Sequence, residues 1–470
     1  MKKIFTILTF LCWCILPNMA QQGDSDAKVI TILTVNDMHS AIDMFPRFAG
    51  IVDSIRSEHP GLLLFSGGDN RTGNPVNDRY MEPGWPMIHL MNLVGFDATA
   101  VGNHEFDNNI AGFRNLIGKS NFRYLCANME MHDSLRLHVT PYRFFEREGI
   151  RIGVLGLIQT GPAGIPDSHP NNIGGIRFQP AEEAVQHYRW MREQCDILIL
   201  LTHCGYRKDL ELAAIFPEAD IIIGGHSHTV ISDRVLRNGV LLAQSGRELR
   251  YVTELTVEVS GGRVTGKKLN VIDTRATTQL NAEIQEVVDG YNDSPIRSTV
   301  LATVVTPFEN AGELGAMLAD AQRDVTQTDI TLQNYGGVRY QTHPVGDFTI
   351  QDAFTLDPFN NEILVFELSG AEVGPLIIST IEIGEYPYVS GITYEYTKGV
   401  IKVLLPDGKP IDNKKIYRIA INSYLAAVCP FLQDKPSVNA GINATDALID
   451  YLKKQQKVDY NGVKRSTIVR

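Results

Sequence analysis

The stretch VGNHEFDN, residues 101–108, follows the apolar run FDATA and precedes NIAGFRNLI, whose apolar spacing is helical. A plain turn between a strand and a helix needs only residues such as glycine and asparagine. This turn instead carries Asn103, His104, Glu105 and Asp107 within five positions. Whether these side chains have a chemical role depends on how the other apolar runs of the chain end.

Five apolar runs end in side chains that bind metal ions. In open α/β sheets, ligands bind outside the carboxyl ends of the strands, so five such ends would converge on one crevice. Any one of these histidines alone would be read as a surface or packing residue, but five at strand ends with Asp and Asn partners favour a site. Residues two apart in extended chain project to one side, which suits the pairs Asp37/His39 and His226/His228. The candidate metal ligands are Asp37, His39, Asp69, Asn103, His203, His226 and His228.

Seven nitrogen and oxygen ligands without a thiolate exceed one tetrahedral zinc site and suit two ions that share a bridge. Asp69 is the natural bridge, because a carboxylate has two oxygens. Imidazole and carboxylate together suit two divalent ions such as Zn, Mn, Fe or Co. With only Asp37 and Asp69 to offset their charge, the ions leave a positive site that attracts phosphate. Two metals about 3.5–4 Å apart can clamp an in-line displacement at phosphorus.

The motifs NDMHS, SGGDN, VGNHEFDN, LTHCGYRKD and GGHSHT resemble, in this order and spacing, the 5′-nucleotidase/UDP-sugar hydrolase family. In that family a calcineurin-like metallophosphoesterase domain precedes a C-terminal 5′-nucleotidase domain. The resemblance implies an α/β fold in which a four-layer αββα domain is followed by a smaller α+β substrate-binding domain. It also implies two metal sites that share Asp69, one completed by Asp37, His39 and His228, the other by Asn103, His203 and His226.

The same resemblance leaves His104 free for catalysis. Asp107 lies three positions further on, one helical turn away and on the same face. It can hold His104 in one tautomer and favour its charged form. His104 would then stabilise the transferring phosphoryl group and protonate the leaving oxygen, whereas Glu105 is interpreted as structural.

Two motifs in the second half resemble the substrate-binding segments of the family. QNYGGVR would contact substrate through Asn334, Gly336, Gly337 and Arg339, the alternative being an ordinary Gly-Gly turn. LDPFNN would stack Phe359 on a nucleobase, the alternative being a phenylalanine buried in the core.

Two departures from the family concern substrate choice and leave the metal ligands untouched. No arginine stands in VVTPFEN, just before the helix start of the second domain, where the family has one. AAVCPF replaces a Gly-rich aromatic loop, so a second stacking ring would have to come from Tyr424, from Phe431 or from nothing.

The chain is expected to divide into a signal peptide at 1–20, a metallophosphoesterase domain at 28–273, a helical linker at 274–299 and a 5′-nucleotidase C-terminal domain at 300–470. A Lys pair, a short apolar stretch and a small residue at the cut are typical of a signal peptide, and a retained anchor would need a longer apolar run. The mature protein is therefore expected to be secreted, most simply periplasmic, without a membrane span. A formal net charge of −11 argues against nucleic acid as a partner. The cysteines of the mature chain, Cys126, Cys195, Cys204 and Cys429, form no Cys-x-x-Cys pair, so a thiolate zinc site is not expected.

These observations predict an exported, metal-dependent hydrolase that releases phosphate from a small-molecule nucleotide or phosphate ester by attack of a metal-bridging hydroxide. The alternative is a related phosphoesterase or pyrophosphatase acting on nucleotide sugars, cyclic nucleotides or a non-nucleotide ester. A non-enzymatic nucleotide-binding scaffold is disfavoured, because no candidate ligand and neither member of the His104–Asp107 pair is missing.

Overall fold

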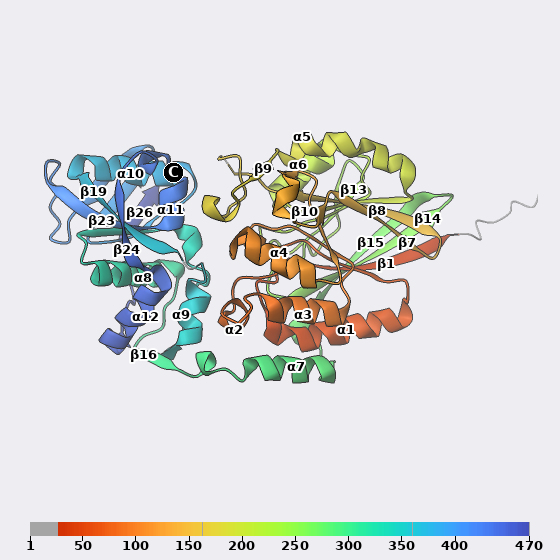
Figure 1. Cartoon of the computed structure of the whole chain (residues 1–470), viewed down its shortest axis with the longest axis horizontal. Helices are drawn as coiled ribbons and strands as arrows, with labels where there is room; N and C mark the ends of the chain where they lie inside the picture. Colours follow the sequence, from red (N-terminus) through yellow and green to blue (C-terminus); the bar gives the residue numbers. More distant parts are fainter. Residues whose placement is uncertain (1–26, 162, 360, 470) are drawn as a thin grey trace, which may run out of the picture.

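The computed structural model describes residues 27–161, 163–359 and 361–469, so the expected signal peptide at 1–20 lies outside the described residues. Two domains lie side by side along the long axis of the molecule, and α7 (Ala282–Asn292) runs along one edge of the larger one (Figure 1). None of the helices in the described residues has the length and apolar character of a membrane span.

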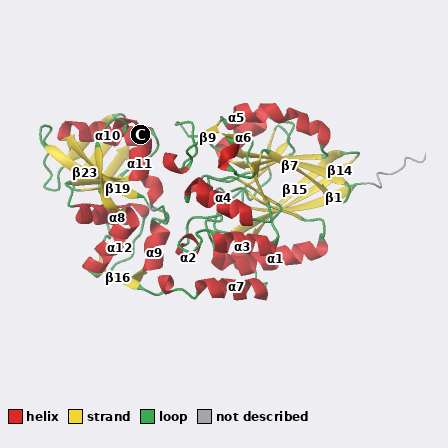
Figure 2. Ribbon diagram, viewed as in Figure 1, coloured by secondary structure: helices red, strands yellow, loops and turns green. Residues whose placement is uncertain are grey.

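The larger domain is built on two sheets that pack face to face (Figure 2). In the described residues one sheet has the order β15 (Arg263–Asp273), β14 (Tyr251–Ser260), β1 (Lys28–Val35), β2 (Leu63–Ser66), β3 (Ala98–Ala100), β4 (Arg123–Leu125) and β6 (Val139–Thr140). The other has the order β12 (Val235–Arg237), β13 (Val240–Ala243), β11 (Ile221–Ile223), β10 (Ile197–His203), β8 (Ile150–Ile158) and β7 (Tyr142–Arg147). A small antiparallel pair joins β5 (Met129–Met131) to β9 (Ile176–Phe178).

Strand β10 shows why these sheets are internal layers. Its sequence ILILLTH is buried throughout. Ile197, Ile199 and Leu201 point into the core between the sheets, whereas Leu198 and Leu200 point toward the helices. Such continuous apolar runs are typical of parallel strands covered on both faces.

Helices cover the outer face of each sheet, which confirms the predicted αββα layers. The seven-stranded sheet shares a core with α1 (Phe45–Glu58), α3 (Trp85–Val94), α4 (Asn109–Lys119) and α7. The other sheet packs against α5 (Ala181–Ala184), the 3-10 helix η5 (Val185–Gln194) and α6 (Tyr206–Ile215). The short helix α2 (Pro75–Asp78) contacts the smaller domain.

The smaller domain is a mixed sheet with helices and two small sheets. The described residues form a sheet in the order β20 (Tyr388–Ser390), β17 (Ile330–Gln333), β23 (Ile416–Asn422), β19 (Glu362–Ser369) and β24 (Ser437–Asn443). The small sheets are β18 (Gly346–Thr349), β16 (Val300–Val304) and β25 (Lys457–Val458), and β22 (Val400–Leu404), β21 (Thr393–Thr397) and β26 (Ser466–Val469). The helices are α8 (Ala311–Thr326), α9 (Ile350–Leu356), α10 (Gly370–Glu382), α11 (Ser423–Val428) and α12 (Ala444–Gln455).

Local sequence explains several of these elements. Asn310 caps α8 by accepting a hydrogen bond from the Glu313 amide at 3.2 Å, which fixes the start of the helix. The turn TKG, residues 397–399, joins β21 to β22 in an antiparallel hairpin. Lys398 and Gly399 both have positive φ there, which the right-handed twist of a tight hairpin requires.

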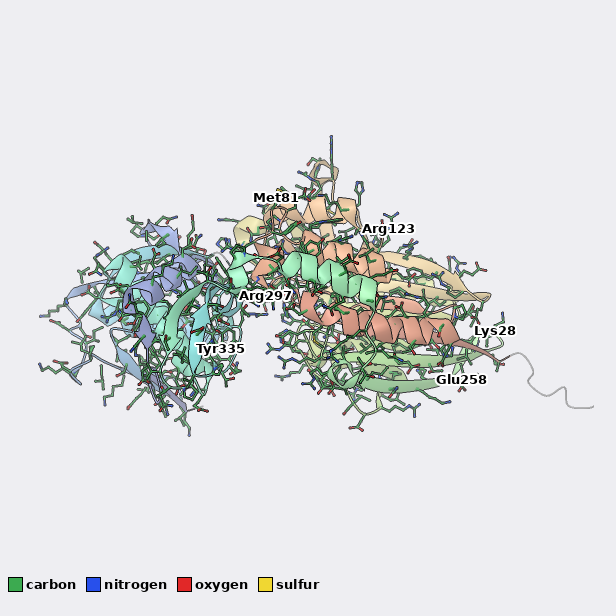
Figure 3. The ribbon with its side chains drawn as sticks, turned by 90° about the horizontal axis from the view of Figure 1, so that it is seen from below. Lys28, Met81, Arg123, Glu258, Arg297 and Tyr335 are labelled. Carbon is green, nitrogen blue, oxygen red and sulfur yellow. The ribbon has the colours of Figure 1, made fainter. Side chains whose placement is uncertain are left out.

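The connecting segment belongs physically to the larger domain. Ile284 and Val288 of α7 are buried in the core that α1 and α3 share. Figure 3 shows α7 lying along α1, with Arg297 at the junction of the two domains. The division at residues 274–299 stays a prediction. The remaining 3-10 helices are η1 (Ile42–Met44), η2 (His104–Phe106), η3 (Asp133–Leu135), η4 (Pro170–Asn172), η6 (Thr274–Ala276), η7 (Pro295–Arg297), η8 (Tyr335–Gly337) and η9 (Pro430–Leu432).

Candidate functional site

The carboxyl ends of strands from both sheets meet at the edge of the larger domain that faces the smaller one. Strands β1, β2 and β3 come from one sheet and β10 and β11 from the other. Side chains after these strands form three overlapping groups whose possible ligand atoms lie within 4.8 Å of one another. The groups are Asp37, His39 and His228; His39, Asp69 and His104; and Asp69, His203 and His226.

The pairs Asp37/His39 and His226/His228 converge by a different route from the one expected. They do not lie in extended chain, because β1 ends at Val35 and β11 ends at Ile223. All four residues, and Asp69 as well, have φ between 45° and 75°. This left-handed conformation is uncommon for residues other than glycine and costs on the order of 1–3 kcal/mol each. Tight left-handed turns, not strand alternation, therefore direct these side chains inward.

The glycines of two motifs let these turns approach one another. A β-carbon on Gly225 would lie 2.5 Å from the Gly67 carbonyl oxygen, closer than real contacts allow. The backbones of SGGDN and GGHSHT are thus packed directly together, which brings Asp69 and His226 to one centre.

One end of the cluster is formed by Asp37, His39 and His228. The Nε2 atoms of the two histidines lie 3.0 Å apart, and Asp37 Oδ1 lies 3.5 Å from His228 Nε2 and 4.0 Å from His39 Nε2. The Asp37 carboxylate also accepts a hydrogen bond from the His226 amide at 3.0 Å, which holds the two turns in register.

The other end is formed around Asn103 and Asp69. Asn103 Oδ1 lies 3.2 Å from His203 Nε2 and 3.1 Å from His226 Nδ1. Asp69 Oδ2 lies 3.1 Å from His203 Nε2. Burial by itself lowers the pKa of His203, but the adjacent Asp69 carboxylate outweighs it and raises that pKa to about 10.

The orientation of the rings fits a divalent cation. His39 Nδ1 lies 3.0 Å from the Thr72 carbonyl oxygen and His203 Nδ1 lies 2.7 Å from that of Gly67. A carbonyl oxygen only accepts, so each Nδ1 carries a proton, and each Nε2 faces the cluster, where it can bind a metal ion once it has no proton of its own. Second hydrogen bonds of this kind are usual for histidines that bind metals. The donor set is therefore suited to hold metal ions.

His104 and Asp107 form the expected pair. His104 lies in the 3-10 helix η2, where residues three apart stand above one another. Its Nδ1 donates to Asp107 Oδ2 at 2.8 Å, and its Nε2 lies 3.9 Å from Asp69 Oδ2. Burial lowers the pKa of His104, but the charges of Asp107 and Asp69 together outweigh it, and the pKa is raised.

Glu105 has contacts that suit a structural role. Its carboxylate is buried and accepts hydrogen bonds from the backbone amides of Asp69, Asn70 and Gly102 at 2.7–3.1 Å. It thereby ties the turn after β2 to the turn after β3. Its side chain faces these amides and not the cavity.

The smaller domain brings two side chains to the same place. Arg339 Nη2 lies 3.3 Å from His39 Nε2, and its guanidinium stands 5.5 Å from the centre of the Phe359 ring. The Phe359 ring in turn stacks on His104 with centroids 5.6 Å apart. Phe359 is half-buried and belongs to none of the hydrophobic cores of the described residues, unlike the core phenylalanine that was the alternative.

The two glycines of the Gly-Gly turn, Gly336 and Gly337, have different roles. Gly336 is exposed and lines the cavity between the domains. A β-carbon on Gly337 would lie 2.2 Å from Gln333 Nε2 and 2.6 Å from Asn334 Oδ1, so Gly337 is required for packing. Asn334 is buried and accepts a hydrogen bond from Asn422 at 2.7 Å.

A cavity of about 180 Å³ lies between the domains and contains most of the candidate residues. Part of the lining was not predicted from the sequence, because these residues lie in segments without a recognisable motif. They are Asp167, Ser168, His169, Asn172, Asn361 and Glu385. Tyr424 lines the cavity, whereas Phe431 packs against the core of the smaller domain. The lining residues are Asp69, Asn103, His104, Asp107, Asp167, Ser168, His169, Asn172, His226, His228, Asn334, Gly336, Arg339, Phe359, Asn361, Glu385 and Tyr424.

Comparison with known proteins accounts for both domains. The calcineurin-like phosphoesterase family matches residues 30–230, and the 5′-nucleotidase C-terminal domain matches residues 294–429. The chain belongs to the 5′-nucleotidase family. This confirms the resemblance seen in the motifs, and it makes the protein a metal-dependent phosphoester hydrolase.

Individual members of the 5′-nucleotidase family align over nearly the whole chain. A 5′-nucleotidase from Vibrio cholerae is 27% identical over 94% of this chain and 93% of its own length. Protein UshA from Escherichia coli is 26% identical over 94% of both chains. A crystal structure of a 5′-nucleotidase precursor from Thermus thermophilus shares the fold with a TM-score of 0.85, at 22% identity, covering 94% of this chain and 99% of its own.

Proposed function

We propose that this protein is an exported 5′-nucleotidase-type phosphohydrolase that holds two divalent ions and releases phosphate from nucleoside monophosphates. The observation that carries the proposal is one cavity lined both by metal-ligand side chains of the larger domain and by Phe359, Tyr424 and Arg339 of the smaller one. The names of the relatives, 5′-nucleotidase among them, support a nucleotide substrate.

The two ions would be held as the sequence predicts, with Asp69 between them. Asp37, His39 and His228 would complete one site, and Asn103, His203 and His226 the other. When bound, the ions would activate water and polarise the oxygens of a phosphoryl group. Zn, Mn, Fe and Co are the ions that suit imidazole and carboxylate donors.

The remaining residues bind the substrate and move a proton. Arg339 enters beside His39 and suits a phosphoryl oxygen, because a guanidinium is a planar donor with a fixed charge. His104, held by Asp107, would donate a proton to the leaving oxygen. Phe359 offers a face on which a base can stack, and stacking accepts every base. We therefore expect little discrimination among bases.

A panel of phosphate esters tests the proposal. Phosphate release is measured from AMP, GMP, UMP, ribose 5-phosphate, UDP-glucose and cyclic AMP, with each of the four metals in turn and with a chelator as control. Hydrolysis of all three monophosphates, lost with the chelator, is the expected result. If UDP-glucose, cyclic AMP or ribose 5-phosphate were hydrolysed far better than AMP, the alternative hydrolase would replace the nucleotidase. Export is tested separately by locating the protein in fractionated cells.

A further inference from the structure

Two carboxylates that belong neither to the candidate metal ligands nor to the His104–Asp107 pair line the cavity. Asp167 lies in the loop after β8 of the larger domain, and Glu385 lies between α10 and β20 of the smaller one. Both line the cavity, together with Tyr424. The two carboxylates thus come from different domains and share one enclosed space.

Several contacts hold these two carboxylates in place. Glu385 accepts a hydrogen bond from the Gly336 amide at 3.3 Å, so it is fixed to the Gly-Gly turn. Asp167 Oδ2 lies 3.5 Å from His226 Nε2, and its carbonyl oxygen accepts from Asn103 at 3.1 Å. Burial raises the pKa of Glu385, and the charge of Asp167 adds to that increase, as expected for carboxylates that face one another.

Cationic side chains are scarce in the cavity lining. Among the described residues that line the cavity, Arg339 is the only lysine or arginine, and it lies beside His39. The charge that acts on Glu385 within the cavity is that of Asp167. A second phosphate bound beside Glu385 would meet negative charge without a partner.

A hydroxyl group next to Asp167 points to a polar ligand. Ser168 is 3% exposed, and its Oγ has no hydrogen-bond partner among the described residues. Buried polar atoms are normally hydrogen-bonded, and exceptions call for an explanation such as a missing ligand. Carboxylates accept hydrogen bonds from hydroxyl and amino groups, whereas they repel phosphate.

We propose that Glu385, with Asp167 opposite, selects phosphate monoesters whose leaving group is uncharged and carries hydrogen-bond donors, and rejects leaving groups that carry a second phosphate. The proposal rests on the phosphohydrolase function of the same cavity. A phosphoryl group at the metal-ligand cluster directs the rest of the substrate toward these carboxylates. Removing a like-charge contact should improve the diphosphate substrate by about tenfold or more.

The test compares Glu385→Gln and Asp167→Asn with the wild type on two substrate pairs. The pairs are AMP with ADP, and fructose 6-phosphate with fructose 1,6-bisphosphate, each measured as kcat/KM from initial phosphate release. Glu385→Gln should raise the ratio of the more charged to the less charged substrate by about tenfold in each pair. Asp167→Asn should act in the same direction but less, because its carboxylate also faces His226. Glu395→Gln is the matched control, since Glu395 is exposed on β21, and it should keep the wild-type ratios.

A ratio within about twofold of the wild type in Glu385→Gln, with the fold intact by circular dichroism, would overturn the proposal. Glu385→Ala is a second variant that removes the charge without an amide, and it should move the ratio in the same direction. If the wild type hydrolysed the sugar phosphates but neither nucleotide, the nucleotidase assignment would fail. The sugar pair would then still decide whether Glu385 selects by charge.

Discussion

Replacing His104 by alanine separates the chemistry of the leaving group from metal binding. His104 Nε2 lies 3.9 Å from Asp69 Oδ2, and its Nδ1 donates to Asp107 at 2.8 Å, so the ring is held for proton transfer. A positioned acid or base contributes roughly 10²–10⁴ in rate, which is about 2.7–5.5 kcal/mol of barrier. We expect His104→Ala to keep its metal ions and to lose about that factor in kcat on AMP.

Asp107→Asn removes the negative charge beside His104 and keeps the shape of the side chain. A hydrogen bond to a charged group contributes about 1.5–3 kcal/mol, so its loss should lower kcat by about 10- to 150-fold. Because the Asp107 charge helps to raise the pKa of His104, the variant should lower that pKa. His104 must be protonated to act as an acid, so the alkaline decline of the pH–rate profile should begin at a lower pH.

The assay compares AMP with p-nitrophenyl phosphate, whose leaving group scarcely needs a proton. Turnover and bound metal, by elemental analysis, are measured for the wild type and both variants. The loss in His104→Ala should be much smaller for p-nitrophenyl phosphate than for AMP. An equal loss on both substrates would refute proton donation and leave His104 acting on the phosphoryl group alone. Loss of metal from His104→Ala would make it a ligand.

Three further predictions concern the metal bridge, the base and a buried carboxyl group. Asp69→Ala should lose both ions, whereas Asp37→Ala should weaken only one, and two bound ions with wild-type turnover in Asp69→Ala would contradict the bridge. Phe359→Ala should raise KM for AMP by about 5- to 150-fold, from roughly 1–3 kcal/mol of stacking, and should change KM for ribose 5-phosphate little. Burial raises the pKa of Asp357 from 3.8 to about 7, so the native state binds the extra proton and stability falls as pH rises between these values. Asp357→Asn should therefore be more stable than the wild type at pH 8 and similar at pH 4, as measured by urea denaturation. If variant and wild type differed in free energy of unfolding by the same amount at both pH values, the raised pKa of Asp357 would be contradicted.

The candidate metal ligands could be predicted from the sequence because each is encoded next to a strong local signal. A buried strand such as ILILLT ends in His203, and the short spacing of His104 and Asp107 places them on one turn. The residue types then predict what is bound, since imidazole and carboxylate groups are ligands of divalent ions. Helix α8 and the β21–β22 hairpin likewise depend on local signals, a helix cap in the first case and a turn in the second.

Only the tertiary structure decided how these signals combine. The strand ends belong to two sheets packed face to face, and the left-handed turns at Asp37 and His39 depend on that packing and not on strand alternation. The place of Phe359 beside His104, and of Glu385 in the same cavity as Asp167, depends on how the second domain meets the first. Local spacing extends over a few residues, whereas these contacts join segments far apart in the chain. The physical reason is that such neighbours are chosen by the packing of whole layers, which no short stretch of sequence records.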